Sequence, residues 1–326
     1  MRQDDSDSAR PAGMDRFAGG GLLVALLVSS GIAFSWPSIT SAHDPFLIHP
    51  WMLLALVAVT MYCLGIVLDR GELLELRQRP LSVLLGVLIQ CTWMPFLAVL
   101  VVEALSLEGD IANGVLLVGC VPGAMASNVL TLTARGNVSY SVSLTTAATM
   151  LSPLTVPLTL MITSDLSASP SMMSPFRTAM ILLATVVAPV TLGYFSKRLA
   201  STWSNALSSL APRIASLALL WIIASVVAAN RGRLSQVPLS WLMALLCMNL
   251  LGYAGGWFLG RLVGLPTAMR RALTLEVGMQ NAGLGTALAA TLFGTDSLTQ
   301  IPTAAYTFGC MLTGTIVAGW WSRSGW

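Results

Sequence analysis

The residue best suited to charge chemistry is Glu276, because it alone among 14 Asp and Glu residues lies well inside a long apolar segment. A carboxylate in the middle of a bilayer costs at least about 2.5–3.5 kcal/mol and therefore faces a partner or a watery cavity. No Lys or Arg lies at a comparable depth in these segments. The oxygen-bearing residues Gln280 and Asn281 follow the acid, and Ser127 and Asn128 occupy a similar stretch earlier in the chain. Hard cations prefer such carboxylate, amide and hydroxyl oxygens, so the pattern favours a sodium site. A protonated structural glutamate and a proton relay remain open alternatives.

Two stretches combine helix breakers with polar residues inside apolar segments. Residues 120–128 include Pro122 and Gly123, and residues 276–283 include Gly278. Membrane helices tolerate Pro and Gly when their neighbours satisfy the freed backbone groups. That alternative explains one kinked helix, but not two breaks that coincide with the most polar stretch of each half. We predict two discontinuous helices whose exposed carbonyls and helix ends bind ions and substrate at a shared site.

Other polar residues in the apolar segments are weaker candidates. Ser141 and Thr145 lie four positions apart and therefore share one helix face, and Gln90 lies in an earlier segment. Hydroxyl and amide groups of this kind often connect neighbouring helices instead of binding a ligand, so both interpretations stay open. Asn249 is interpreted as a packing residue, because no helix breaker accompanies it.

The elements that must position these residues are membrane-spanning helices. Of the 326 residues, 55% are hydrophobic and only 10% are charged, with a mean hydropathy of +0.77. Soluble domains carry about 25% charged residues. We predict an all-α polytopic membrane protein, because apolar runs of about 20 residues, each long enough to cross a bilayer, recur throughout the chain. The ten predicted spans are residues 17–36, 49–68, 80–102, 111–135, 139–163, 175–195, 211–230, 238–263, 269–293 and 301–321.

Charge and cysteine content exclude several other classes of protein. The net charge of +3 comes from scattered basic residues, which argues against nucleic-acid binding. The five cysteines fall at irregular spacing inside apolar runs, and they form neither a metal-binding pattern nor a disulfide framework.

The Lys and Arg residues orient the spans. Of the 17, only Arg177, Arg231 and Arg233 fall on one side of the membrane in the ten-span arrangement. Cytoplasmic loops are enriched in Lys and Arg, so we expect a multi-pass protein of the cytoplasmic membrane with both termini in the cytoplasm. The basic start, the apolar core and the small residues 40–42 also resemble a cleaved signal peptide. Cleavage there would leave nine spans.

The ten spans divide into two halves of five. The predicted organisation is a cytoplasmic tail at 1–16, a first repeat at 17–163, a linker at 164–174, a second repeat at 175–321 and a cytoplasmic tail at 322–326. An odd number of spans per half forces the second half to insert upside down. This is the inverted-repeat plan of many secondary transporters, and each predicted break falls in the fourth span of its half.

These motifs resemble those of the bile acid:sodium symporter family. Residues 122–138, which begin Pro-Gly-Ala-Met-Ala-Ser-Asn, are similar to the family's fourth-span signature, residues 151–154 to its fifth span and residues 276–284 to its ninth. The resemblance covers spans three to five and eight to ten. It implies a panel domain of spans one, two, six and seven, a core domain of the other six, and fourth and ninth spans that cross at unwound centres.

The same resemblance implies a set of ligands for each of two sodium ions. The first site would contain Ser127, Asn128, Ser141, Thr145 and Glu276. The second would contain Gln90, Glu276, Gln280 and the carbonyls of Val277 and Met279. The implied substrate-binding positions are Asn281, Asn128, Met125, Cys310 and Met311.

Some substrate positions depart from the family pattern. Met125 stands where bacterial relatives often have Thr, and Cys310 and Met311 stand where some have a His-Asn pair, whereas Asn281 is retained. We therefore expect a sodium symporter for an amphipathic or small organic anion that works by alternating access, with no obligate protein partner. A proton-coupled or ion-independent exporter of the same fold is the alternative. A membrane enzyme or sensor is disfavoured, because neither HExxH nor GxSxG occurs.

Overall fold

The computed structural model of the chain describes residues 18–39, 43–68, 78–166, 174–199, 204–234, 237–294 and 297–324. These residues form α-helices and one π-helical turn, and the described part of the chain contains no β-strand. The predicted tail at 1–16, the small residues 40–42, most of the predicted linker and the last two residues lie outside the described residues.

Eight helices in the described residues are long and apolar enough to cross a membrane. A helix satisfies its own backbone hydrogen-bonding groups, which lipid cannot do. The described part of the chain is thus all-helical, and the protein is a polytopic integral membrane protein, as predicted. The eight are α1 (Ala18–Ile39), α2 (Pro50–Val67), α4 (Pro80–Ala104), α7 (Val138–Leu166), the continuous run of α8 (Pro175–Leu182), η1 (Leu183–Val187) and α9 (Ala188–Leu199), α10 (Ser204–Ala229), α12 (Leu239–Leu262) and α15 (Gln300–Arg323).

Two pairs of shorter helices occupy the predicted fourth and ninth spans. The first pair is α5 (Gly109–Cys120) and α6 (Ala126–Thr133), and the second is α13 (Thr267–Gly278) and α14 (Ala282–Phe293). Non-helical residues 121–125 and 279–281 separate the members of each pair. A single-turn helix, α11 (Arg231–Leu234), follows α10.

Several helices extend beyond the predicted spans. α10 begins at Ser204 and not at residue 211, and α9 ends at Leu199 and not at residue 195. Apolar composition marks the part of a helix that lipid surrounds. Backbone hydrogen bonding continues into the polar interface, so the helices are longer than their apolar stretches.

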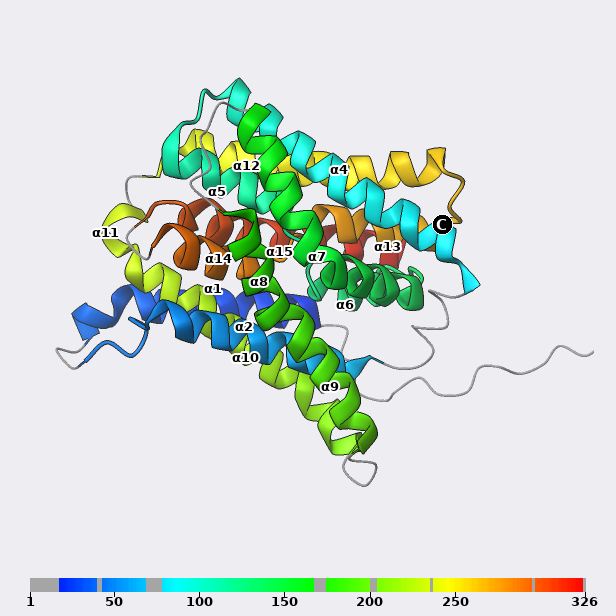
Figure 1. The fold of residues 1–326 in the computed structure, drawn as a ribbon, viewed down its shortest axis with the longest axis horizontal. Coiled ribbons are helices and arrows are strands. Elements are labelled where there is room, and N and C mark those ends of the chain that lie inside the picture. The colour runs from blue at the N-terminus through cyan, green and yellow to red at the C-terminus, as the bar shows by residue number, and fades with distance from the viewer. Residues whose placement is uncertain are drawn as a thin grey trace, which may run out of the picture.

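The helices form two groups that face each other (Figure 1). α1, α2, α9 and α10 pack together along the lower side of the view, and α4, α5 and α12 lie along the upper side. Between them lie α13, α14 and α15, with α14 against α2 and α10, and α15 and α6 against α1. α7 and α8 run across the front and lead from the upper group to α9 in the lower one. Both pairs of short helices therefore lie in or beside the middle of the protein.

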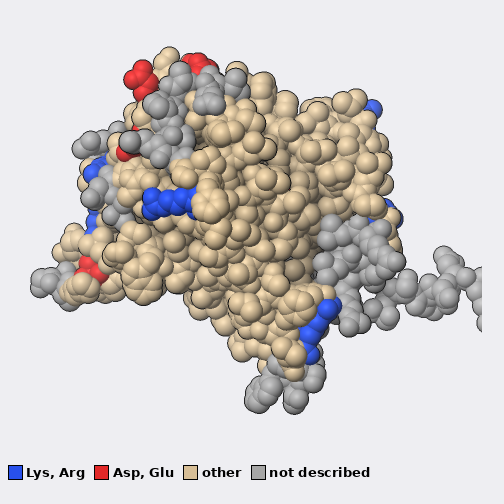
Figure 2. All heavy atoms as spheres, in the orientation of Figure 1, with Lys and Arg blue, Asp and Glu red and all other residues tan. Residues whose placement is uncertain are grey.

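The surface has the charge distribution of a membrane protein (Figure 2). On the face shown, most of the visible Lys, Arg, Asp and Glu side chains lie toward the margins, one basic side chain lies farther in at the left, and the broad central area carries neither sign of charge. Large apolar side chains are exposed on the protein surface; Leu154, Phe176 and Phe258 are 68%, 74% and 64% exposed. Such a surface suits contact with lipid.

Candidate functional site

The two interrupted helices meet at their breaks. The backbone N–H of Ala124 donates to the carbonyl of Met279 at 2.7 Å, and the N–H of Asn281 donates to the carbonyl of Pro122 at 2.8 Å. These bonds pair the two non-helical segments in antiparallel fashion, with a bridge between residues 123 and 280. A helix break within a membrane leaves backbone N–H and C=O groups without intrahelical partners. Here each broken segment supplies hydrogen-bond partners for some of these groups in the other segment.

Glu276 occupies the centre of this crossing. Its side chain is fully buried, and its Oε2 accepts hydrogen bonds from Ser127 Oγ at 2.5 Å and from Thr145 Oγ1 at 2.8 Å. Its Oε1 is buried without a hydrogen-bond partner. A side-chain carbon at Gly123 would overlap this carboxylate, so glycine is required for the close approach. The described residues thus give the carboxylate two hydroxyl donors and no cationic side chain.

The other members of the first predicted sodium site lie against these groups. Asn128 Oδ1 accepts hydrogen bonds from Ser141 Oγ at 2.8 Å and from Thr145 Oγ1 at 3.2 Å. Thr145 Oγ1 is also within hydrogen-bonding distance, 3.0 Å, of the Ser141 carbonyl. The Thr145 hydroxyl has one hydrogen and faces three acceptors, including Glu276. The cluster therefore contains more acceptor oxygens than hydroxyl hydrogens that can bond to them, an arrangement that suits a bound cation.

The second predicted set forms a chain of amides beside the same glutamate. Gln90 Nε2, from α4, donates to Gln280 Oε1 at 3.2 Å, and Gln280 Nε2 donates to the Val277 carbonyl at 3.0 Å. Both glutamine side chains are 1% exposed. Gln90 Oε1 is buried without a hydrogen-bond partner, as Glu276 Oε1 is. Each predicted sodium site thus contains a buried oxygen that no hydrogen bond satisfies.

The predicted substrate positions fall in two different environments. Asn281 lies at the crossing, where its side chain caps α14 by accepting from the Leu284 N–H at 3.1 Å. Met125 is partly buried at the start of α6. Cys310 and Met311 are 2% and 3% exposed within the packed apolar core of α15. The structure thus brings Asn281 and Met125 to the crossing but keeps the α15 pair enclosed.

The half-helices α6 and α13 are joined at their far ends as well. Arg271 is 4% exposed, and its Nη1 donates to the carbonyl of Ala134, the C-cap of α6, at 2.9 Å. The Asn137 N–H donates to the Ala268 carbonyl at 2.9 Å. A cation at a helix C-terminus complements the helix dipole. The two half-helices are therefore held as one unit at both ends.

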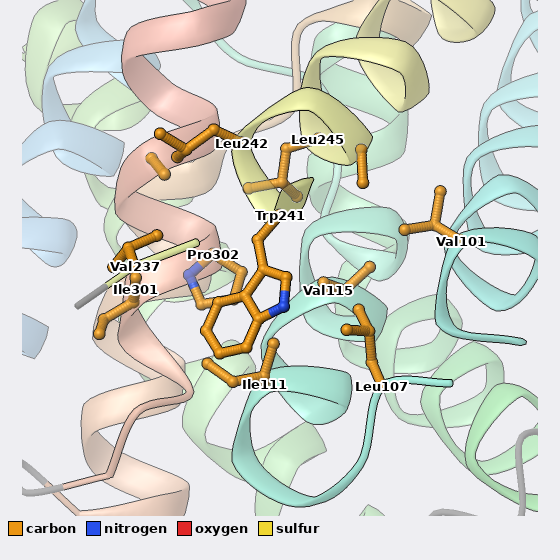
Figure 3. Close-up of a pocket in the computed structure, with 12 residues that line it drawn as sticks. Val101, Leu107, Ile111, Val115, Val237, Trp241, Leu242, Leu245, Ile301 and Pro302 are labelled. Carbon is orange, nitrogen blue, oxygen red and sulfur yellow. The ribbon is translucent and has the colours of Figure 1, made fainter. Parts of the chain in front are cut away.

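An apolar pocket lies elsewhere, around Trp241 (Figure 3). Trp241 projects among the side chains of α5, α12 and α15. None of the predicted sodium or substrate residues lines it. Its lining carries no charged group that would hold an anion or a cation, so this pocket is not the candidate site. The lining residues are Val101, Leu107, Ile111, Val115, Val237, Trp241, Leu242, Ala244, Leu245, Ile301, Pro302 and Ala305.

Two residues at the crossing were missed by the sequence reasoning. Asn249, interpreted as a packing residue, donates through Nδ2 to the Gly278 carbonyl at 2.7 Å, and the Tyr306 hydroxyl donates to the same carbonyl at 2.8 Å. The sequence predicted only that some buried donors must be present, because a helix that ends inside a membrane needs hydrogen-bond donors for its last carbonyls. It does not say which residues supply them.

Comparisons with known proteins support the family resemblance that the sequence motifs indicated. The family model described as "Sodium Bile acid symporter family" matches residues 54–237. The chain is 31% identical over 312 residues to the "Uncharacterized sodium-dependent transporter YocS" of Bacillus subtilis (strain 168), which covers 95% of this chain and 93% of that protein. It is 31% identical over 274 residues to "Probable sodium/metabolite cotransporter BASS1, chloroplastic" of Arabidopsis thaliana, over 84% of this chain and 67% of the relative. It is also 31% identical over 238 residues to "Sodium/bile acid cotransporter 4" of Homo sapiens, over 72% of this chain and 54% of the relative.

Proposed function

The chain belongs to the sodium bile acid symporter family, and from this premise we propose that it is a sodium-coupled secondary transporter of an organic anion. The observation that carries the proposal is the fully buried Glu276 carboxylate, surrounded by side-chain oxygens, with one of its own oxygens unpartnered. A buried carboxylate with no cationic side chain is strongly unfavourable unless a mobile cation or a proton neutralises it. The relatives are named as sodium-dependent transporters or sodium cotransporters, which supports sodium as the ion.

We assign two sodium ions to the crossing, which share Glu276. The contacts between Glu276, Ser127, Asn128, Ser141 and Thr145 support the first site. The amide chain from Gln90 through Gln280 to the Val277 carbonyl supports the second, in which Met279 supplies another carbonyl. Oxygen ligands of these kinds are what hard cations prefer. The unpartnered oxygens Gln90 Oε1 and Glu276 Oε1 would each be satisfied by an ion.

Sodium binding would prepare the crossing for an anion. Two helices end here, α5 and α13, and two begin here, α6 and α14. Helix C-termini carry partial negative charge and suit the cations, whereas helix N-termini carry partial positive charge and suit an anion. Once the charge of Glu276 is neutralised, an anionic group would be held by Asn281, Asn128 and the N-termini of α6 and α14.

Transport would proceed by movement of one helix group against the other. Counting α5 with α6 and α13 with α14 as single interrupted spans, the eight long helices and these two pairs make the ten-span inverted repeat, with 17–163 and 175–321 as its halves. The panel would consist of the lower group of Figure 1, α1, α2, α9 and α10, together with α8 and η1, which lead into α9. The remaining helices would be the core. Rocking of the core against the panel would expose the crossing to either side in turn. In this arrangement both termini are cytoplasmic.

The residues at the substrate positions favour an amphipathic anion. Met125, Cys310 and Met311 are apolar or weakly polar, and Met adapts to irregular apolar surfaces. An anion with a substantial apolar body would place that body against Met125, which is partly buried at the crossing, and its charged end near Asn281. Small polyhydroxylated acids would find fewer polar partners.

A sodium titration of the purified protein tests the proposal. Thermal unfolding is followed at constant ionic strength while choline is replaced by sodium, and a parallel series uses potassium. Sodium should raise the unfolding temperature progressively, with the logarithm of its concentration once that exceeds the dissociation constant, and potassium should not. An unfolding temperature that follows pH but not sodium would instead favour proton coupling, and one that responds to neither would remove ion coupling altogether.

A further inference from the structure

Two buried side chains of neighbouring helices converge on one backbone oxygen, the carbonyl of Gly278 at the end of α13. Asn249 of α12 donates through Nδ2 at 2.7 Å, and Tyr306 of α15 donates its hydroxyl at 2.8 Å. Both side chains are 1% exposed. A carbonyl oxygen has two lone pairs, so these donors occupy the Gly278 carbonyl fully.

The Asn249 amide is itself held in this orientation. Thr313 Oγ1 donates to Asn249 Oδ1 at 2.6 Å, so the amide oxygen faces Thr313 and the amide nitrogen faces Gly278. The Tyr253 hydroxyl lies 3.2 Å from Thr313 Oγ1 and donates to the Cys310 carbonyl at 3.1 Å. The donors to Gly278 thus belong to a network between α12 and α15.

Close packing of α12 on α13 brings this network to the helix end. A side-chain carbon at Gly256 would lie 2.7 Å from Thr274 Cα, and one at Gly252 would lie 3.2 Å from Gly278 Cα. Small residues allow the backbones of membrane helices to approach closely. The short Asn249 side chain can therefore reach the Gly278 carbonyl.

The peptide unit between Gly278 and Met279 is consequently fixed at both of its ends. Its carbonyl binds Asn249 and Tyr306, and its N–H, that of Met279, donates to the Leu275 carbonyl at 2.9 Å. A peptide unit is planar, so fixing its two polar ends fixes its orientation. This in turn restricts the adjacent peptide units, whose carbonyls are those of Val277 and Met279.

The two adjacent carbonyls differ from that of Gly278 in their remaining capacity. The Val277 carbonyl accepts a hydrogen bond from Gln280 Nε2 at 3.0 Å, and the Met279 carbonyl accepts one from the Ala124 N–H at 2.7 Å. Each has a second lone pair to offer. These are the two carbonyls assigned above to the second sodium site.

We propose that Asn249 and Tyr306 are positioning residues of the second sodium site. By binding the Gly278 carbonyl they hold it away from the ion and set the directions of the Val277 and Met279 carbonyls that face it. The inference rests on the proposed function, because it presupposes sodium at the crossing. It makes α12 and α15 contributors to ion affinity, although neither supplies a ligand to this site.

Sodium titrations of purified full-length variants, without substrate, test this role. Tyr306→Phe deletes one hydroxyl, and Thr313→Val deletes the hydroxyl that orients Asn249. Each should raise the sodium midpoint, meaning the sodium dissociation constant fitted to the rise of the unfolding temperature with sodium, about fivefold. Fivefold is the factor by which one typical buried hydrogen bond changes an equilibrium. Thr286→Val is the matched control, because it removes a buried hydroxyl contact of 2.9 Å to Thr303, between α14 and α15, without touching Gly278.

The sodium midpoint separates positioning from a purely structural role. A structural role would lower the unfolding temperature in choline and leave the sodium midpoint where it is, as expected for Thr286→Val. That behaviour in Tyr306→Phe overturns the inference. If the wild-type protein shows no response to sodium, it is the proposed function that fails, and the positioning role fails with it.

Discussion

The sharpest prediction concerns Glu276→Gln, which keeps the size of the side chain and removes its charge. Glu276 belongs to both assigned sodium sites and is fully buried. The glutamine retains an oxygen that can accept from Ser127 and Thr145, so the fold should survive. In sodium-free buffer we expect the variant to be at least as stable as the wild type, because a neutral amide replaces a buried carboxylate that lacks a cation.

The two proteins should exchange their order of stability when sodium is added. A ligand at 100 times its dissociation constant stabilises by about 2.7 kcal/mol, which for a chain of this size raises the unfolding temperature by about 4 °C. Removing one partner of a buried charge pair costs about 3–5 kcal/mol, a loss in sodium affinity of more than about a hundredfold. At the same sodium concentration the variant should therefore gain less than about 0.5 kcal/mol.

The assay is thermal unfolding of both purified proteins in choline and in sodium at equal ionic strength. Asp110→Asn is the matched control, because it makes the same acid-to-amide change at a carboxylate that accepts from the Leu298 N–H at 3.0 Å, away from the crossing. The control should keep the wild-type sodium response. A Glu276→Gln variant that also keeps this response would refute the assignment of Glu276 as the ion ligand.

Three further predictions follow from the same geometry. Gly123→Ala should abolish stabilisation by sodium in thermal unfolding, because the added methyl group overlaps the Glu276 carboxylate. An unchanged sodium midpoint would contradict the crossing geometry. Gln90→Leu removes a proposed ligand of one site only, so sodium-dependent uptake into proteoliposomes should change from a sigmoidal to a hyperbolic dependence on sodium. A curve that stays sigmoidal would argue against a second ion at Gln90. Met125→Thr should shift competition for uptake toward polar acids, whereas an unchanged ranking of competitors would place Met125 outside the substrate pocket. All three can be measured on the same purified material.

Much of the fold was predictable, because membrane insertion depends on local composition. Lipid cannot satisfy backbone hydrogen bonds, so any long apolar run must become a helix. The eight continuous helices lie at the positions of eight predicted spans. The limits were less predictable: α10 begins at Ser204, in a polar stretch where hydropathy gives no signal.

The candidate site was predictable where a residue was unusual for its surroundings. Glu276 is conspicuous as an acid within an apolar segment, and the breakers near Pro122 and Gly278 mark the two interruptions that the structure contains. Ser141 and Thr145 were less distinctive. Their shared helix face followed from spacing, but hydroxyls on a helix are common, and only the fold brings Thr145 within 2.8 Å of Glu276.

By itself, then, the sequence determined the membrane-spanning class, the two broken helices and the one acid within an apolar segment, because each is a property of one short stretch of side chains. The tertiary structure alone decided which distant groups meet. Gln90 reaches Gln280, and Asn249 and Tyr306 reach the carbonyl of Gly278. A backbone carbonyl is present at every residue and leaves no mark in the sequence, so its partners are selected only by how closely the helices pack.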